Sequence, residues 1–173
     1  MNGRALVVMG VSGCGKSSVG QALAARFGLR FVDGDDLHDA RAVAMMRSGT
    51  PLTDDDRWPW LDRVGALLAH EAAAGAGVVV ACSALRRAYR DRLRRACSAT
   101  RFVFLDGDAA LIGARLQHRR EHYMPATLLQ SQFNTLERPA ADERDVARVD
   151  ISPPAEQVVE QAAAALERLD TGD

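Results

Sequence analysis

Five short apolar runs divide the chain, and stretches with a different pattern lie between them. Uninterrupted apolar runs of this length are typical of parallel strands that are buried on both faces. Between the runs, apolar positions recur at spacings of three and four, which is the pattern of amphipathic helices. The predicted strands cover residues 4–9, 30–33, 78–82, 102–106 and 146–151. This alternation predicts an α/β fold in three layers, with a five-stranded parallel sheet between helices.

The predicted helices begin and end at residues suited to those positions. Gly28 can end a helix over residues 16–27, because glycine adopts the left-handed conformation that follows many helices. The Thr and Asp residues of segment 49–56 suit the start of the next long helix, and the glycines of segment 75–77 end it. Further helices are predicted over residues 88–97, 109–120 and 155–169.

Composition is ordinary for one soluble globular domain over residues 1–173. Apolar residues make up 47% and charged residues 26%, which argues against disorder. The formal net charge of −1 provides no basic field for a nucleic acid or an anionic membrane. No run of 18 apolar residues occurs, and the N-terminal run is too short for a signal peptide, so we expect a cytoplasmic protein. Three cysteines lack the paired spacing of a zinc site and are expected to be buried: Cys14, Cys82 and Cys97.

A glycine-rich phosphate loop follows the first predicted strand. Residues 10–17 read GVSGCGKS, which matches G-x-x-x-x-G-K-[ST] and opens a predicted helix, as that motif requires. Lys16 is the only lysine among 22 basic residues, and its compact ammonium can reach the β- and γ-phosphates. The Ser17 hydroxyl can ligate Mg²⁺, while backbone N–H groups point at phosphate oxygens. We therefore predict an ATP site formed by Gly10, Val11, Ser12, Gly13, Cys14, Gly15, Lys16, Ser17 and Ser18.

Two carboxylates follow the second predicted strand, where Asp33 and Asp35 flank Gly34. Ligands of open α/β sheets bind at the carboxyl ends of the strands. One carboxylate could support Mg²⁺, and the other could accept the proton of an attacking hydroxyl. An Asp-Gly turn chosen only for its conformation is the alternative. The neighbouring phosphate loop favours the functional interpretation.

Six arginines crowd residues 86–95, and for most of them a solvated helix face is the simpler interpretation. Arg86 and Arg90 are four residues apart, so one helix face could present both to an anionic substrate. Tyr89 is the only aromatic residue among them, which does not favour a nucleic-acid surface.

Another group of arginines precedes a polar loop near residue 122. A mobile lid that carries arginine over the transferring phosphate is the functional interpretation. Arginines favoured by the dipole at a helix end are the alternative. The group consists of Arg115, Arg119 and Arg120.

Taken together, the motifs resemble the gluconate kinase family of small P-loop kinases. The family implies ATP-dependent phosphorylation of D-gluconate at its terminal hydroxyl, with Mg²⁺, to give 6-phosphogluconate. It also implies a nucleoside-monophosphate-kinase-like P-loop NTPase fold, a lid over about residues 119–140, and commonly a homodimer. The resembling segments span nearly the whole chain in order: 10–17, 33–38, 49–61 (GTPLTDDDRWPWL), 82–94 and 122–143.

The resemblance also implies roles for single residues. Lys16 and Ser17 would hold nucleotide and metal, Asp33 would support Mg²⁺, and Asp35 would orient or deprotonate the sugar-acid hydroxyl. Arg119 resembles the lid arginine. The positions that flank adenine would be Arg115 and the turn of Pro153 and Pro154, with Pro154 as the predicted binding residue. The other predicted substrate residues are His38, Arg57, Arg86 and Arg90, of which the three arginines are candidates for the carboxylate of gluconate.

The segment after His38 departs from the family pattern. The family usually continues with Pro and has Asn and Lys at the positions of Ala42 and Met45, whereas this chain has Asp39 after the histidine. If those positions touch the substrate, affinity or selectivity for gluconate would change.

Two other functions remain open. One is a small-metabolite kinase of the shikimate or nucleoside monophosphate kinase type, although those families do not share residues 49–61. The less favoured one is a nucleotide-binding regulator without a small substrate. A GTPase-like switch would need an N-K-x-D motif, which a chain with its only lysine at position 16 cannot have.

Overall fold

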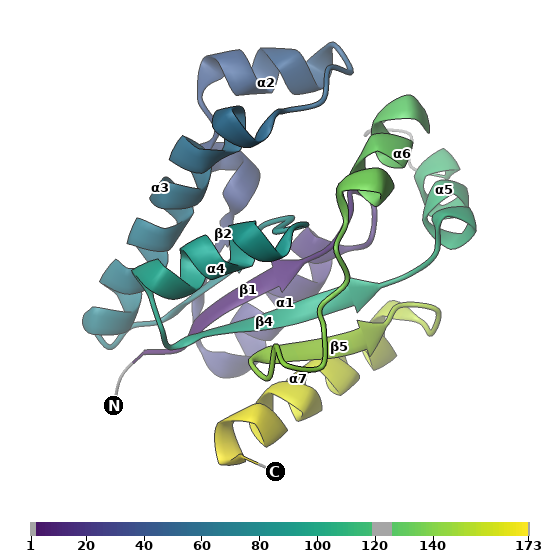
Figure 1. The fold of residues 1–173 in the computed structure, drawn as a ribbon. Coiled ribbons are helices and arrows are strands. Elements are labelled where there is room, and N and C mark those ends of the chain that lie inside the picture. Colours follow the sequence, from purple (N-terminus) through teal and green to yellow (C-terminus); the bar gives the residue numbers. More distant parts are fainter. Residues whose placement is uncertain (1–2, 119–125, 173) are drawn as a thin grey trace.

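A five-stranded parallel sheet forms the centre of the molecule, with helices on both faces (Figure 1). The computed structural model describes residues 3–118 and 126–172. The strands lie in the order β2-β3-β1-β4-β5, and every neighbouring pair is parallel. The predicted α/β class and sheet are confirmed. The strands are β1 (Ala5–Met9), β2 (Arg30–Asp33), β3 (Val78–Ala81), β4 (Thr100–Asp106) and β5 (Val146–Asp150).

The helices follow the sequence pattern closely, and a short 3₁₀ helix, η1 (Gly34–Leu37), follows β2. The polar segment between β2 and the long helix contains one further helix, and another lies in the segment before β5. None of the described helices is long and apolar enough to cross a membrane. The α-helices are α1 (Lys16–Phe27), α2 (Ala40–Arg47), α3 (Asp54–Ala73), α4 (Arg87–Ala96), α5 (Ala109–Gln117), α6 (Ala126–Thr135) and α7 (Ala155–Thr171).

Both faces of the sheet are covered by apolar side chains. On one face Leu6 of β1 joins a buried cluster with residues of α1 and α7, such as Leu23. On the other face Val7 joins a cluster with Trp60 of α3 and Leu93 of α4. Because every residue of β1 is buried, its sequence has no polar alternation. The three cysteines lie in these clusters, as predicted.

Side chains and glycines at the helix ends explain where the helices begin and stop. Gly28 has a φ of 66°, and its N–H bonds to carbonyls of the last turn of α1. Thr53 and Asp56 form a reciprocal capping box at the start of α3. The Asp39 carboxylate accepts a hydrogen bond of 2.8 Å from the Ala42 N–H, which makes it the cap of α2. Asp39, one of the departures from the family pattern, therefore has a structural role here.

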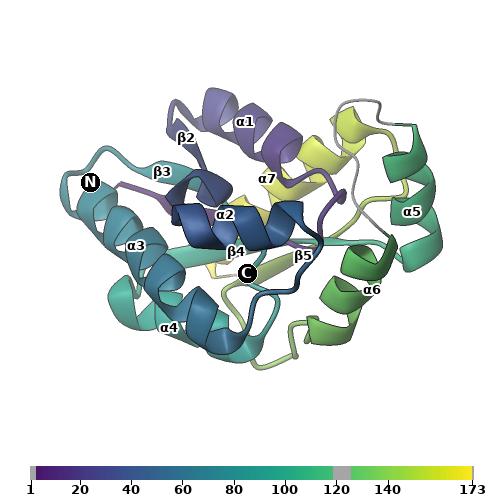
Figure 2. The same ribbon diagram turned by 90° about the horizontal axis from the view of Figure 1, so that it is seen from above.

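The carboxyl ends of the strands share one edge of the sheet, and the loops that follow them gather there. Figure 2 shows this edge, with α6 beside α5 and α2 set apart from both. The phosphate loop follows β1, η1 follows β2, and segment 82–86 follows β3. This arrangement brings the predicted functional segments to the same side of the molecule.

Candidate active site

The phosphate loop turns sharply between β1 and α1. Gly13 and Gly15 have φ values of 83° and 99°, which side chains of other residues rarely adopt. A Cβ atom on Gly13 would lie 2.7 Å from the side chain of Leu116, so the turn also lacks room there. Gly15 is the N-cap of α1. The backbone N–H groups of the first turn are therefore open to an anion.

Lys16 lies folded over the phosphate loop. Its Nζ donates a hydrogen bond of 3.0 Å to the carbonyl oxygen of Val11. The pKa of Asp35 is raised by loss of solvation, and the Lys16 ammonium opposes this rise, which places the only lysine of the chain near the predicted proton acceptor. A compact cation in this position suits the β- and γ-phosphates.

Ser17 and Asp33 are brought together by α1 and β2. The Ser17 hydroxyl donates to Asp33 Oδ2 at 3.1 Å, and the N–H of Asp35 donates to Asp33 Oδ1 at 3.0 Å. Hydroxyl and carboxylate oxygens are ligands that fit Mg²⁺. No cluster of three or more His, Cys, Asp or Glu side chains able to hold a metal occurs in residues 3–118 and 126–172. A magnesium ion here would take its other ligands from phosphates and water.

Asp35 stands in the first turn of η1, close to Asp33 and Lys16. The Asp35 side chain is 74% exposed, but the protein atoms around its carboxyl group reduce its solvation and raise its pKa. The Lys16 ammonium opposes this rise, and the neighbouring Asp33 and Asp36 add to it. A carboxylate with a raised pKa accepts a proton more readily than an ordinary aspartate.

His38 lies against Trp60 at the end of η1. The two rings stack with centroids 4.1 Å apart, and the Trp60 Nε1–H donates to the Gly34 carbonyl oxygen at 2.7 Å. The His38 side chain is only 3% exposed, and its Nε2 is 4.0 Å from Asp35 Oδ1. Burial lowers the pKa of His38 to about 4, and the nearby Arg63 lowers it further. His38 is therefore neutral at physiological pH and presents little surface to a ligand.

Arg57 and Arg86 meet around the carboxylate of Asp54. Arg57 Nη1 donates to Tyr89 Oη at 2.8 Å, and the Tyr89 hydroxyl donates to Asp54. Arg86 Nη1 lies 3.4 Å from the other carboxylate oxygen. The side chain of Arg86 is 42% exposed and that of Arg57 is 14% exposed. Two of the predicted substrate arginines are thus neighbours, with part of each open to solvent.

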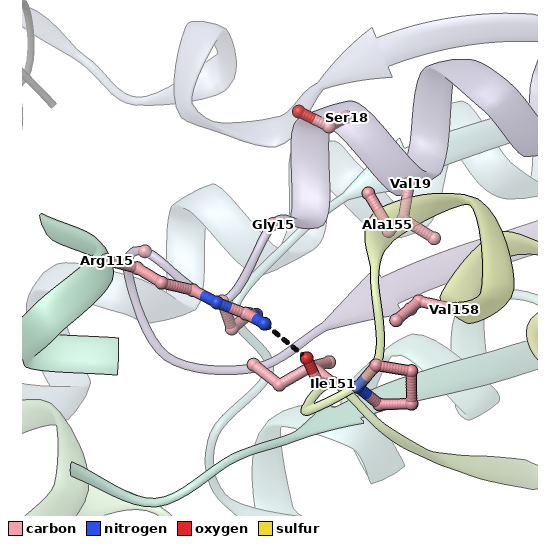
Figure 3. A pocket seen from close by; sticks show the side chains of 10 residues that line it. Gly15, Ser18, Val19, Arg115, Ile151, Ala155 and Val158 are labelled. Carbon is pink, nitrogen blue, oxygen red and sulfur yellow. Dashed lines mark hydrogen bonds between the residues drawn. The ribbon is translucent and has the colours of Figure 1, made fainter. Parts of the chain in front are cut away.

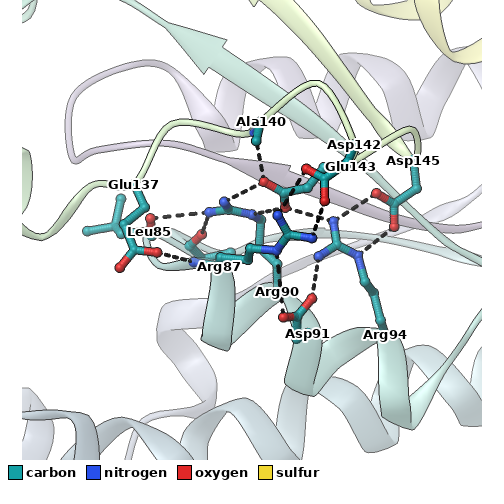
Figure 4. A network of polar contacts seen from close by, with 11 residues as sticks. Leu85, Arg87, Arg90, Asp91, Arg94, Glu137, Ala140, Asp142, Glu143 and Asp145 are labelled. Carbon is teal, nitrogen blue, oxygen red and sulfur yellow. Dashed lines mark hydrogen bonds and ion pairs between the residues drawn. The ribbon is translucent and has the colours of Figure 1, made fainter.

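The prediction that Arg90 contacts the substrate is wrong for this structure. Its side chain is fully buried and forms a two-fold ion pair with Glu143. Figure 4 shows its guanidinium facing Glu143 and the loop of Leu85, with other arginines of α4 paired to Asp142 and Asp145. A guanidinium that is fully occupied by the protein cannot also bind a carboxylate of a ligand.

A cavity of about 260 Å³ lies between the phosphate loop and the start of α7 (Figure 3). Arg115 points into this region, and its Nη2 donates to the Ile151 carbonyl oxygen at 2.6 Å. The wall includes Pro153, whereas the predicted Pro154 is the exposed N-cap of α7. The cavity is lined by Gly13, Cys14, Gly15, Ser18, Val19, Arg115, Ile151, Pro153, Ala155 and Val158.

Two further residues complete the comparison with the sequence predictions. Arg119, the predicted lid arginine, lies outside the described residues. Gln132 of α6 was not predicted, yet its Oε1 accepts a hydrogen bond of 2.6 Å from the Ser12 N–H of the phosphate loop. No local sequence signal connects a glutamine with a loop 120 residues away. Helix α6 nevertheless contacts the phosphate loop.

Comparison with known proteins identifies the family. Residues 6–141 match the family described as "AAA domain". The thermosensitive gluconokinase of Escherichia coli (strain K12) is 43% identical over 166 residues, which cover 96% of this chain and 89% of that protein. This chain belongs to the gluconokinase family. The gluconokinase of Gluconobacter oxydans (strain 621H) is 49% identical over 140 residues, which cover 81% of this chain and 79% of that protein.

A solved structure agrees with this assignment. The gluconokinase from Sinorhizobium meliloti 1021 has a TM-score of 0.91 and 46% sequence identity, and the match covers 98% of this chain and 94% of that one. The resemblance that the motifs indicated is therefore confirmed along nearly the whole gluconokinase fold.

Proposed function

We propose that this protein is an ATP-dependent gluconokinase that phosphorylates D-gluconate at its terminal hydroxyl to give 6-phospho-D-gluconate. The observation that carries the proposal is the juxtaposition of Lys16, Asp33 and Asp35 in a member of the gluconokinase family. This group unites a cation for the phosphates, a metal ligand and a proton acceptor.

The nucleotide side of the site comprises the phosphate loop and the cavity beside it. Backbone N–H groups of the first turn of α1 and the Lys16 ammonium would hold the phosphates. The adenine would lie in the cavity beside Arg115 and Pro153. Mg²⁺ would be held by Ser17 and by Asp33, directly or through its water shell, and would neutralise charge on the phosphate oxygens.

The acceptor side begins at Asp35. Its carboxylate would take the proton of the terminal hydroxyl as that oxygen bonds to the γ-phosphorus and the bond to the β-phosphate oxygen breaks. The leaving ADP carries the electron pair of the broken bond. The raised pKa of Asp35 favours this proton transfer.

The carboxylate of gluconate would bind between Arg57 and Arg86, because the two side chains are neighbours and each is partly exposed. Arg119 remains our candidate for a lid arginine that covers the transferring phosphate. A homodimer in the cytoplasm is the expected assembly and location.

A coupled assay for ADP release tests the proposal. With ATP and Mg²⁺, release should require D-gluconate and should not occur with shikimate or nucleoside monophosphates. ADP release that depends on shikimate or a nucleoside monophosphate would show that the protein is a kinase for that acceptor. ATP binding without turnover on any acceptor would favour a nucleotide-binding regulator.

Replacement of the proton acceptor gives a sharper test. Asp35→Asn should lower kcat by about 100-fold or more, whereas Asp36→Asn, an adjacent exposed acid in the same turn, should change it little. In the wild type, kcat/KM should fall as the pH drops through the raised pKa of Asp35, because only the ionised form accepts the proton. An acid limb shared by wild type and Asp35→Asn would contradict this role.

A further inference from the structure

Segment 82–86 joins β3 to α4 and carries Arg86 to the site. Within it Ala84 has a φ of 44°, and no other non-glycine residue of segments 3–118 and 126–172 has a positive φ. A residue with a Cβ atom is strained in this conformation, and such strain persists only where the surroundings hold it. The segment would relax without a restraint.

The Leu85 carbonyl oxygen accepts a hydrogen bond of 2.8 Å from the Glu137 N–H, and Arg90 of α4 restrains both Leu85 and the strained Ala84. Its Nη1 donates to the carbonyl oxygens of Ala84 and Leu85, at 3.0 and 3.2 Å. Its Nε and Nη2 donate to the two carboxylate oxygens of Glu143, at 2.7 and 2.9 Å (Figure 4). One planar guanidinium therefore clamps the strained turn against a buried carboxylate.

The carboxylate partner is itself firmly held. Burial would disfavour its charged form, but hydrogen bonds from Arg90, from the Ala140 N–H and from Arg94 hold the pKa of Glu143 at about 2. The Ala140 bond is 3.0 Å long and the Arg94 bond is 2.9 Å long. Glu143 is thus charged at any physiological pH and keeps the Arg90 guanidinium in place.

The clamped turn lies between the two halves of the site. On one side the Ser83 carbonyl oxygen accepts a hydrogen bond of 3.2 Å from the Gly10 N–H at the start of the phosphate loop. On the other side Arg86 reaches toward Asp54. The conformation of Ala84 and Leu85 therefore determines where Arg86 stands relative to the phosphate loop.

We propose that Arg90 is a positioning residue for the acceptor, because it holds the strained turn at Ala84 and thereby fixes the place of Arg86. This inference rests on the proposed function, in which Arg86 binds the carboxylate of the sugar acid. Arg90 acts without touching the substrate.

The replacement Arg90→Lys separates charge from shape. A lysine keeps the positive charge beside Glu143, but its single nitrogen cannot bond to both carboxylate oxygens of Glu143 and to both carbonyl oxygens of the turn, as the three nitrogens of Arg90 do. We expect KM for gluconate to rise about tenfold, with kcat and KM for ATP changed by less than about threefold. The matched control is Arg94→Lys, since Arg94 bonds to the same Glu143 but not to the turn; its KM for gluconate should stay within about twofold.

A second replacement distinguishes positioning from general stability. Glycine adopts a positive φ without strain, so Ala84→Gly should remove most of the need for the clamp. In the Arg90→Lys protein, Ala84→Gly should return KM for gluconate to within about threefold of the wild type. A general loss of stability would not be rescued in this specific way.

Three results would overturn the inference: an unchanged KM for gluconate in Arg90→Lys, the same rise in Arg94→Lys, or no rescue by Ala84→Gly. If Arg90→Lys does not fold, Glu143→Gln takes its place in the test. We expect Glu143→Gln to raise KM for gluconate about threefold and to leave KM for ATP unchanged. An unchanged KM for gluconate would then overturn the inference. A wild-type protein inactive on gluconate would refute the proposed function instead.

Discussion

At Lys16 the requirement is for a small cation rather than for charge alone. Every other basic residue of the chain is an arginine, yet the residue that bonds to the Val11 carbonyl oxygen within the phosphate loop is a lysine. A guanidinium is wider than an ammonium and delivers its hydrogen bonds as a planar fork. The loop is crowded at Gly13, where even a Cβ atom would lie 2.7 Å from Leu116.

Lys16→Arg should therefore lose most activity although the charge is kept. We expect kcat to fall at least about 100-fold, close to the loss in Lys16→Ala. Steady-state kinetics with saturating ATP measure the effect, and circular dichroism checks that both variants fold. Turnover near that of the wild type in Lys16→Arg would contradict the argument from size.

His38 links the pH to the stability of the folded protein. Its pKa is about 4 in the folded state and 6.5 without perturbation, because burial and nearby arginines disfavour the charged ring. Between these values the unfolded chain takes up a proton that the folded protein does not. The contribution of neutral His38 to the free energy of unfolding is therefore complete above pH 6.5 and is lost as the pH falls toward 4.

We expect the wild type to lose on the order of 2 kcal/mol of unfolding free energy from this group between pH 7 and pH 4. Urea unfolding at several pH values measures the slope, which should be smaller in His38→Gln. The control His70→Gln removes an exposed histidine of α3 and should leave the slope unchanged. Equal slopes in wild type and His38→Gln would count against a buried neutral His38.

At the scale of elements, the start of α3 affects both stability and the site. The Thr53 hydroxyl accepts from the Asp56 N–H at 3.2 Å, and the Asp56 carboxylate accepts from the Thr53 N–H at 2.9 Å. These bonds satisfy N–H groups that have no partner within the helix. The same turn carries Arg57 and Asp54.

Thr53→Ala should destabilise the protein by about 1 kcal/mol, because the side-chain cap is lost. Thr53→Ser keeps a hydroxyl acceptor and should recover most of that loss. Chemical denaturation of the three proteins measures the difference. A loss in Thr53→Ser as large as in Thr53→Ala would show that the hydroxyl is not the stabilising group.

The elements themselves were predicted well, and their long-range contacts were not. Apolar runs such as β1 and glycine stops such as Gly28 depend on local physics, so the sequence shows them directly. Arg90 of the basic helix α4 was predicted to contact the substrate, whereas it is buried against Glu143, 53 positions away. Charge pairing across such a distance leaves no local pattern, and neither does the contact between Gln132 and Ser12.

At the scale of the whole molecule, ligand binding should raise the free energy of unfolding and the melting temperature. A ligand that binds only the folded state at 100 times its dissociation constant adds about 2.7 kcal/mol. For a chain of this length that corresponds to a rise in melting temperature of roughly 5–10 °C. We expect this rise with ATP and Mg²⁺ together.

Asp33→Asn should reduce the part of that rise that depends on Mg²⁺, because the carboxylate that we propose as a metal ligand loses its charge. The rise with ATP and a chelator should remain, since the phosphate loop is intact. Scanning calorimetry of wild type, Asp33→Asn and the control Asp36→Asn measures both parts. A full magnesium effect in Asp33→Asn would place the metal elsewhere.

The solitary lysine gives the protein a built-in reporter. Apart from the amino group at the start of the chain, reagents that acylate amines have a single side chain to modify, and it lies over the phosphate loop, where we propose that the triphosphate binds. The mass gained after brief acylation would consequently measure how much of the sample has an empty nucleotide site, with no label or engineered residue required.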